Sequence, residues 1–237
     1  VAGVLFNFLL ALFIYSMVLF TWGDTFLPLK NVKAGMDYSE TFHNVGFQDG
    51  DILLKADDTE LERFGEDCFR RVLNAQTVTV LRGGVETVIP IPEDMAQRVM
   101  RDKKGFASYR FPMVVRELGK TESGESPAAV QPGDSIVSIN GIVTPSFYEV
   151  GEVLAQNKDK DVLVGFYRAG IPQTLTLHTD TAGKMGIYSV SPFDMYQTVT
   201  RKYGFFESFP AGVMLGVNTL KGYVSDMKYV FTKEGAS

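Results

Sequence analysis

The chain has 237 residues, of which 45% are hydrophobic and 22% are charged, the balance of an ordinary folded protein with room for two modest domains. Its formal net charge of −5, with no block of Lys or Arg, excludes a basic face, so nucleic acid is not an expected partner. A single cysteine, Cys68, excludes an internal disulfide and a thiolate zinc site, and the two histidines, His43 and His178, have no ligand-type neighbour at metal spacing.

The first stretch of the chain is apolar and uncharged. Residues 1–22 carry only Asn7, Ser16 and Thr21 as polar side chains, and their number reaches the ~20 residues that a bilayer-spanning helix requires. A signal peptide is the alternative, but the stretch has no basic segment before it and no small-residue cleavage site before Asp24. We therefore expect a membrane helix, in a chain that begins inside a larger protein.

Two later segments share one pattern. Residues 48–58 read QDGDILLKADD and residues 131–141 read QPGDSIVSING, so a Gly-Asp turn, an apolar strand and a polar turn recur after 83 positions. Further apolar and turn residues recur at a spacing of 86, which places a short insertion near residues 157–161. Two copies are too few for a solenoid, so each copy is expected to form a small closed domain.

The first copy is expected to contain a strand, a helix and a hairpin. Ile52 to Leu54 are expected to form a strand, Glu62 to Leu73 have helical spacing, and Thr77 to Leu81 pair with Val85 to Ile91. Gly83-Gly84 supplies the positive φ of a tight hairpin, and Pro90 and Pro92 end its second strand. A charged helix is expected over residues 93–104.

The second copy repeats this order. The sequence predicts a strand over residues 113–118, a polar loop over 120–126 and a helix over 146–155. A hairpin over 162–167 and 174–177 follows, and residues 183–187 close the unit. After Pro192 an apolar stripe from Phe206 to Phe231 predicts an amphipathic helix that is interfacial or packed on a partner; docking on the second copy is the alternative.

The second copy resembles a bacterial PDZ domain. The resemblance is carried by Ser126-Pro127-Ala128-Ala129, by Pro132-Gly133-Asp134 and by Ile139-Asn140-Gly141, followed by a helix and a hairpin. The first copy departs from it with Asp57-Asp58 in place of Asn-Gly. The expected fold is α+β: a transmembrane helix (1–22), two tandem PDZ-like domains (23–110 and 111–191), each a small β-barrel or sandwich with helices, and an amphipathic juxtamembrane region (192–237).

The whole arrangement resembles the RseP-type site-2 proteases. Their second transmembrane helix carries a Gly-Pro-x-x-Asn-Phe-x-x-Ala motif, which Gly3, Asn7, Phe8 and Ala11 match, while Val4 replaces the proline. The resemblance implies a membrane zinc metalloprotease of the bacterial inner membrane that cleaves single-span membrane proteins, with its PDZ units on the extracytoplasmic side. Membrane lipid and such substrates are then the expected partners.

The zinc chemistry of that family needs an HExxH helix and a later Leu-Asp-Gly segment, and neither occurs in this sequence. The resemblance therefore implies a central fragment that is inactive alone, with no catalytic or metal residue of its own and with the zinc ligands outside residues 1–237. A membrane-anchored PDZ scaffold without catalysis is the competing class. An HtrA-like serine protease is disfavoured because no nucleophile turn is present.

The resemblance also implies substrate-binding residues. A PDZ groove accepts an extended peptide as an added strand, and residues 183–187 would offer backbone N–H groups to its C-terminal carboxylate. In the alternative, the same side chains only fill the core and the domains act as a steric filter. Asn7 would bond the backbone of a substrate helix, or else a neighbouring helix. The candidate binding residues are Asn7, Phe147, Val150, Leu154, Gly183, Met185, Gly186 and Ile187.

Overall fold

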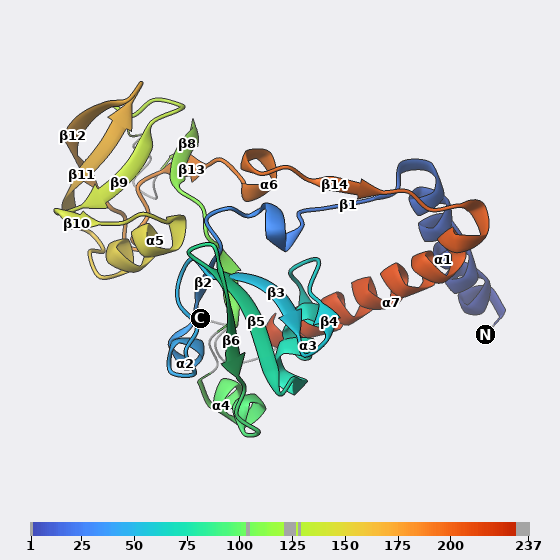
Figure 1. Cartoon of the computed structure of the whole chain (residues 1–237). Helices are drawn as coiled ribbons and strands as arrows, with labels where there is room; N and C mark the ends of the chain where they lie inside the picture. The colour runs from blue at the N-terminus through green and yellow to red at the C-terminus, as the bar shows by residue number, and fades with distance from the viewer. Residues whose placement is uncertain (1, 103–104, 121–126, 128, 231–237) are drawn as a thin grey trace. The chain divides into compact units, whose positions relative to one another are not determined.

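A computed structural model describes residues 2–102, 105–120, 127 and 129–230 of the chain (Figure 1). The chain forms two compact units. One consists of the residues up to Phe26 together with those from Val199 onward, and the other consists of Leu27 to Thr198. The first unit therefore joins the two ends of the chain. The predicted loop over 120–126 and the Ser126 and Ala128 positions fall outside the described residues, except for Lys120.

The terminal unit consists of two long helices and a short β-ribbon. Helix α1 (Ala2–Trp22) is the one described helix that is long and apolar enough to cross a membrane, with a mean hydropathy of 2.3 over its candidate span. It ends at Gly23, whose φ of 82° lies in the left-handed region that stops a helix. Strand β1 (Asp24–Phe26) pairs antiparallel with β14 (Val199–Arg201), and α7 (Phe205–Val230) follows.

The first repeat, residues 27–110, is built around a four-stranded antiparallel sheet in the order β4-β3-β5-β6. Strands β2 and β7 form a separate antiparallel pair. Its elements are η1 (Leu29–Asn31), β2 (Met36–Tyr38), α2 (Glu40–His43), β3 (Ile52–Ala56), β4 (Thr59–Glu60), α3 (Glu66–Asn74), β5 (Thr77–Arg82), β6 (Val85–Pro90), α4 (Met95–Asp102) and β7 (Ala107–Tyr109).

The second repeat, residues 111–191, has one antiparallel sheet in the order β12-β11-β9-β8-β13, with β10 on β9. Strand β13 is at one end of that order, so β8 is its single partner strand in the described sheet. The elements are β8 (Met113–Leu118), β9 (Ser135–Ile139), β10 (Ile142–Val143), α5 (Phe147–Ala155), β11 (Asp161–Arg168), β12 (Ile171–His178) and β13 (Ile187–Ser189); α6 (Pro192–Met195) follows.

Each repeat has its own buried core. In the first, residues between Leu29 and Phe106 converge, including Phe42, Val72 and Val80 at 0% exposure. In the second, residues between Met113 and Met185 converge around Ile139 and Val164. The expected α+β class with an N-terminal apolar helix is confirmed at this level. Both hairpins are confirmed as well: β5 pairs with β6 across Gly83 and Gly84, with φ of 55° and 86°, and β11 pairs with β12 across Ala169 and Gly170, with φ of 50° and 79°.

The repetition extends to single backbone bonds. Gly50 N–H donates to Met36 O at 2.8 Å in the first repeat, and Gly133 N–H donates to Val115 O at 2.8 Å in the second. Met36 pairs with Tyr109 on β7, and Val115 pairs with Ser189 on β13. Phe106 lies three residues before Tyr109, and Gly186 lies three residues before Ser189. Phe106 is therefore the counterpart of Gly186 in the first repeat.

One helix boundary differs from the prediction. The helix expected from Glu62 begins at Glu66, because Glu62 O accepts a hydrogen bond from Leu29 N–H at 2.9 Å and Arg63 forms a β-bridge with Pro28. Gly65, with φ of 154°, then turns the chain into α3. Non-local backbone pairing thus overrides the helical spacing of residues 62–65.

Candidate functional site

The candidate site lies at the free edge of β13 in the second repeat. Ile187 faces Leu118 across the ladder, and the bond from Gly119 N–H to Gly186 O at 2.8 Å makes that a non-hydrogen-bonded pair. The N–H and C=O of Ile187 therefore point away from β8, toward the unpaired edge. An extended peptide can add to such an edge as a further strand.

The turn that leads into β13 is organised by Asp180. Its Oδ1 accepts hydrogen bonds from Ala182 N–H at 3.0 Å and Lys184 N–H at 2.7 Å, and its backbone O accepts from Gly183 N–H at 2.9 Å. Gly183 has φ of 78°, and a Cβ there would lie 2.8 Å from Leu154 O, so glycine allows the turn to touch the end of α5. The N–H of Gly183 is therefore already used inside the turn.

Two donors of this turn remain. Among the described residues, none accepts a hydrogen bond from the N–H of Met185 or Gly186. They directly precede the free edge of β13, so the turn and the edge together offer a short row of backbone donors. A carboxylate at the end of an extended peptide is the group that such donors suit.

The candidate side chains have different surroundings. Val150 is 1% exposed, and Leu154 and Met185 also belong to the buried core of the second repeat. Phe147 is half-exposed and stacks on Phe111, with ring centroids 5.2 Å apart, while its N–H donates to Phe111 O at 2.8 Å. The first residue of the second repeat thus contacts the start of α5. Sequence reasoning had not indicated this contact.

The equivalent place in the first repeat is filled. Phe106, the counterpart of Gly186, is 5% exposed and stacks on Phe69 of α3 with centroids 5.2 Å apart. Its ring also lies 4.5 Å from that of Phe42 and 5.8 Å from that of Phe64. The first repeat therefore packs its own ring against Phe69 of α3 at this place, where the second repeat has a glycine.

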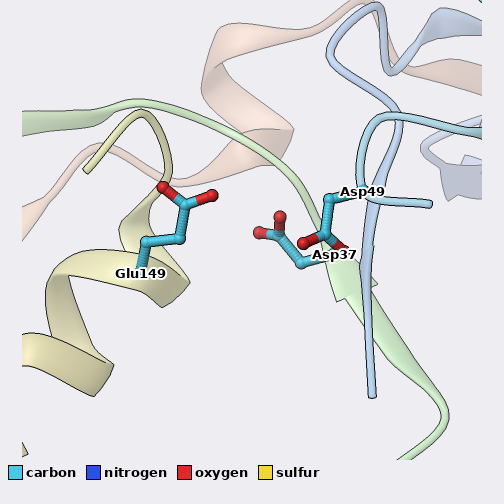
Figure 2. Close-up of side chains that lie close together, drawn as sticks. All are labelled: Asp37, Asp49 and Glu149. Carbon is cyan, nitrogen blue, oxygen red and sulfur yellow. The ribbon is translucent and has the colours of Figure 1, made fainter. Parts of the chain in front are cut away.

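Three carboxylates from separate elements point toward one another in Figure 2: Asp37 from β2, Asp49 from the turn before β3 and Glu149 from α5. Arg110 pairs with Asp37 and, through Nη2, with Glu149 Oε1 at 2.9 Å. Asp49 Oδ1 accepts from Tyr38 N–H at 2.7 Å and contacts His43 Nε2 at 2.9 Å. The guanidinium of Arg110 thus already provides a positive charge to these carboxylates.

This cluster does not fit the zinc that the resemblance implies. Structural and catalytic zinc sites use His and Cys ligands, with at most a minority of carboxylates, whereas this group offers carboxylate oxygens alone. Burial raises the pKa of Asp37 above its ordinary value, and the neighbouring Arg110 opposes that rise. We read the cluster as an ion-pair network between the repeats.

Asn7 lies on α1 and is exposed, among apolar neighbours that are exposed as well. Within the described part of the chain its amide has no hydrogen-bond partner. Asn7 belongs to the terminal unit, whereas both repeats belong to the other unit. Asn7 and the β13 edge are therefore two separate candidate sites.

Cys68 and His178 have contacts that are typical of structural residues. Cys68 is buried in the first repeat, and that burial raises the pKa of its thiol to about 12. His178 contacts Asp161 at 2.9 Å and Asp159 at 3.3 Å, which raises its pKa. Neither residue contributes to the β13 edge.

Comparison with models of known protein families gives no match for this chain. The function is therefore inferred from the geometry of the repeats and from the resemblance of the sequence.

Proposed function

We propose that the chain is the membrane-anchored central part of an intramembrane zinc metalloprotease that cleaves single-span membrane proteins, and that its second repeat is a PDZ-like module which takes up an extended substrate segment. The observation that supports uptake is the free edge of β13 beside the N–H groups of Met185 and Gly186. Backbone pairing along an edge supplies affinity without demanding one particular sequence.

The first repeat has a different part in this proposal. Because Phe106 is buried against α3 at the place equivalent to Gly186, the first repeat acts by its bulk and excludes substrates with large extracytoplasmic domains. The second repeat then holds the shortened segment that passes this filter. Both repeats lie, on this proposal, on the extracytoplasmic face of the bacterial inner membrane, with α1 in the bilayer.

The zinc is proposed to be held by residues outside 1–237, since no described cluster has a suitable donor set. When bound, the zinc would supply an activated water for peptide hydrolysis. The residues of this chain bind and orient the substrate: the β13 edge holds an extended segment, and the Asn7 amide is available to a backbone group of an opened helix.

Peptide titration tests the binding role. The full chain in detergent is titrated with a fluorescent peptide that ends in an apolar residue, against the same peptide amidated at its C-terminus. Loss of the charged acceptor should weaken binding about tenfold, which corresponds to ~1.4 kcal/mol. Equal affinity for both peptides, or none for either, leaves the filter as the sole role of the repeats.

A pair of variants locates the site. Ile187→Pro removes the N–H that faces the free edge and leaves the pairing with β8 intact, whereas Ile187→Val keeps that N–H. Binding should be lost in the first variant and kept in the second, with unchanged thermal unfolding in both. Unweakened binding to a folded Ile187→Pro protein would place the peptide elsewhere.

Zinc content and cleavage separate the protease from a scaffold. A protein that contains this chain together with the zinc-binding segments that the proposal requires is purified, its zinc is measured, and a single-span membrane substrate is offered with and without a chelator. Stoichiometric zinc and chelator-sensitive cleavage are expected. A protein that binds peptide but holds no zinc and cleaves nothing is a membrane-anchored PDZ-like scaffold.

A further inference from the structure

Helices α1 and α7 are in contact within the terminal unit, where Figure 1 shows both. They run antiparallel, because Phe205 lies against Phe20 while Gly216, further along α7, lies against Leu12. Phe205 stacks edge-on against Phe20 with centroids 5.6 Å apart, and Phe209 lies 6.3 Å from Phe13. The β1–β14 ribbon fixes the start of the pair, and Lys202 Nζ donates to Trp22 O at 3.0 Å at the end of α1. The contact therefore begins where α1 ends and continues along it.

Two glycines make the contact close. A Cβ at Gly212 would lie 2.6 Å from the backbone N and Cα of Ser16, and a Cβ at Gly216 would lie 2.9 Å from Leu12 Cδ2. Ser16 is 1% exposed, so α7 covers it fully. Small residues four positions apart let two helix backbones approach, and this spacing is a common way for helices to associate in membranes.

Three hydroxyl side chains of this stretch are hydrogen-bonded within their own helices, while the amide of Asn218 is exposed on α7. Ser16 Oγ donates to Leu12 O at 2.9 Å, Thr219 Oγ1 to Leu215 O at 2.9 Å, and Ser208 Oγ to Phe205 O at 2.7 Å. Hydroxyls bonded to a carbonyl one turn earlier can lie in hydrocarbon without a water partner. These hydrogen bonds are independent of the glycine packing and indicate the same surroundings.

The residue pairs between α1 and α7 show how far along the two helices their contact extends. From Phe205 to Gly216 the chain advances eleven residues while its partner on α1 moves from Phe20 back to Leu12. At 1.5 Å per residue this is about 16 Å along the helix, roughly half the ~30 Å hydrocarbon core. A helix lying on the bilayer surface could not follow a spanning helix over that length.

We propose that α7 enters the bilayer beside α1, and that its outward apolar face contacts lipid acyl chains instead of the membrane surface. Residues 208–220 carry no charge, and Glu207 and Lys221 bound them at either end. Lys221 lies close enough to the far side for its long side chain to reach the polar region. The lipid-facing residues are Phe206, Val213, Met214, Leu220 and Tyr223, all exposed in the protein alone.

This inference rests on the proposed membrane position of α1, and one fluorescence experiment separates the two. Trp22 is the sole tryptophan, so the unaltered chain in liposomes reports the end of α1. Two further proteins carry Trp22→Phe with either Phe206→Trp or Met214→Trp. Each is quenched with lipids brominated near the headgroup or deep in the acyl chain.

The Met214→Trp reporter should be quenched at least about twofold more by deep than by shallow bromines, because it lies some 12 Å further along the helix than position 206. The Phe206→Trp reporter and Trp22 should respond more to shallow bromines. If both α7 reporters respond to shallow bromines alone, α7 lies on the surface and the inference is overturned. If Trp22 itself responds to neither lipid, the anchor proposed for α1 fails.

A matched pair of variants tests the role of α1. Gly212→Leu in the Met214→Trp background forces the helices apart and should make the reporter shallower, whereas Val213→Leu on the outward face should leave its depth unchanged. Circular dichroism confirms that the repeats remain folded. A deep reporter in folded Gly212→Leu protein would overturn the claim that packing on α1 holds α7 in the bilayer.

Discussion

Arg168 holds the buried carboxylate of Asp134 with two hydrogen bonds, from Nε to Oδ1 at 2.8 Å and from Nη2 to Oδ2 at 2.6 Å. The first repeat has the same pair, with Arg82 donating to both oxygens of Asp51 at 2.8 and 2.6 Å. Each Asp is 1% exposed. In both repeats the Arg before the hairpin turn thus fixes the Gly-Asp turn before the central strand.

We expect Asp134→Asn to lower the free energy of unfolding of the second repeat, and Asp51→Asn that of the first, by about 2 kcal/mol each. An amide directs N–H groups at the guanidinium where a carboxylate accepts from it. Hydrogen exchange by mass spectrometry locates each effect. Asp58→Asn, at an exposed turn, should change stability by less than about 0.5 kcal/mol. Equal loss of protection in both repeats from either variant would contradict the prediction.

The second repeat should also lose stability in acid through Asp134. The hydrogen bond from Arg168 holds the pKa of Asp134 below its ordinary value of 3.8. A carboxyl whose pKa is depressed in the folded state stabilises fully above its unfolded pKa, so this contribution is constant above about pH 5 and disappears as the pH falls through the folded pKa. Thermal unfolding between pH 6 and 3 should show a shallower loss in Asp134→Asn. Identical slopes would exclude this carboxyl as a source.

Arg110 connects the two repeats through Asp37 and Glu149, and Glu149→Gln removes the pair to the second repeat alone. We expect the repeats to become more mobile relative to each other while each keeps its melting temperature. Spin labels at Glu86→Cys and Thr174→Cys measure this as a broader distance distribution. Glu152→Gln, exposed on the same helix, is the control. A distribution unchanged by Glu149→Gln would show that the Arg110–Glu149 pair does not restrain the repeats.

Local patterns of the sequence predicted much of this fold. The uncharged run gave α1, and Gly83-Gly84 gave the first hairpin, because a tight turn with positive φ needs only neighbouring residues. The polar turns after β3 and β9 also follow from local chemistry: Asp57 and Asn140 have φ of 49° and 51°, and both tolerate that conformation.

Distant contacts explain what the sequence did not indicate. Strands β1 and β14 pair across some 175 residues, and α3 starts late because Glu62 bonds to Leu29. The sequence does not distinguish Arg110 from other charged residues, because its partners Asp37 and Glu149 are distant in the chain and meet it only in the fold. At the candidate site the sequence predicted helix α5 and the turn over residues 183–187. No local sequence pattern indicated that Phe106 occupies the equivalent place in the first repeat. Arg82 recurs as Arg168 at the 86-residue spacing of the repeats, and this recurrence is the sequence signal for the two Asp–Arg ion pairs.

Cys68 should be inert in the folded chain, because burial raises the pKa of its thiol to about 12. At pH 8 roughly one thiol in 10⁴ is then ionised, and the thiolate is the reactive form. We expect a maleimide to label the native protein at least about 100-fold more slowly than the protein in concentrated guanidinium chloride. An added Glu86→Cys should react rapidly. Native Cys68 that reacts as fast as the Glu86→Cys thiol would show that the core opens readily.

Asn7 should affect cleavage more than membrane insertion, if the proposed function holds. Its amide is exposed on α1 with no partner among the described residues, and an unpaired amide in hydrocarbon costs several kcal/mol, about 4 or more on an alkane scale. An opened substrate helix has backbone groups that need such a partner. We therefore expect that Asn7→Leu, made in the protease that the proposed function requires, keeps the zinc and the membrane level and slows cleavage of a single-span substrate about tenfold or more.

The control for Asn7 is Leu5→Ala, a change at an exposed apolar position on the same helix, which should leave cleavage within about twofold of the unaltered protein. Asn7→Gln, which keeps the amide on a longer side chain, should recover part of the lost rate. Cleavage at the normal rate by Asn7→Leu, with normal zinc, would reduce Asn7 to a structural hydrogen bond with a neighbouring helix. A fall in membrane level that tracks the fall in rate would assign Asn7 to helix packing in the same way.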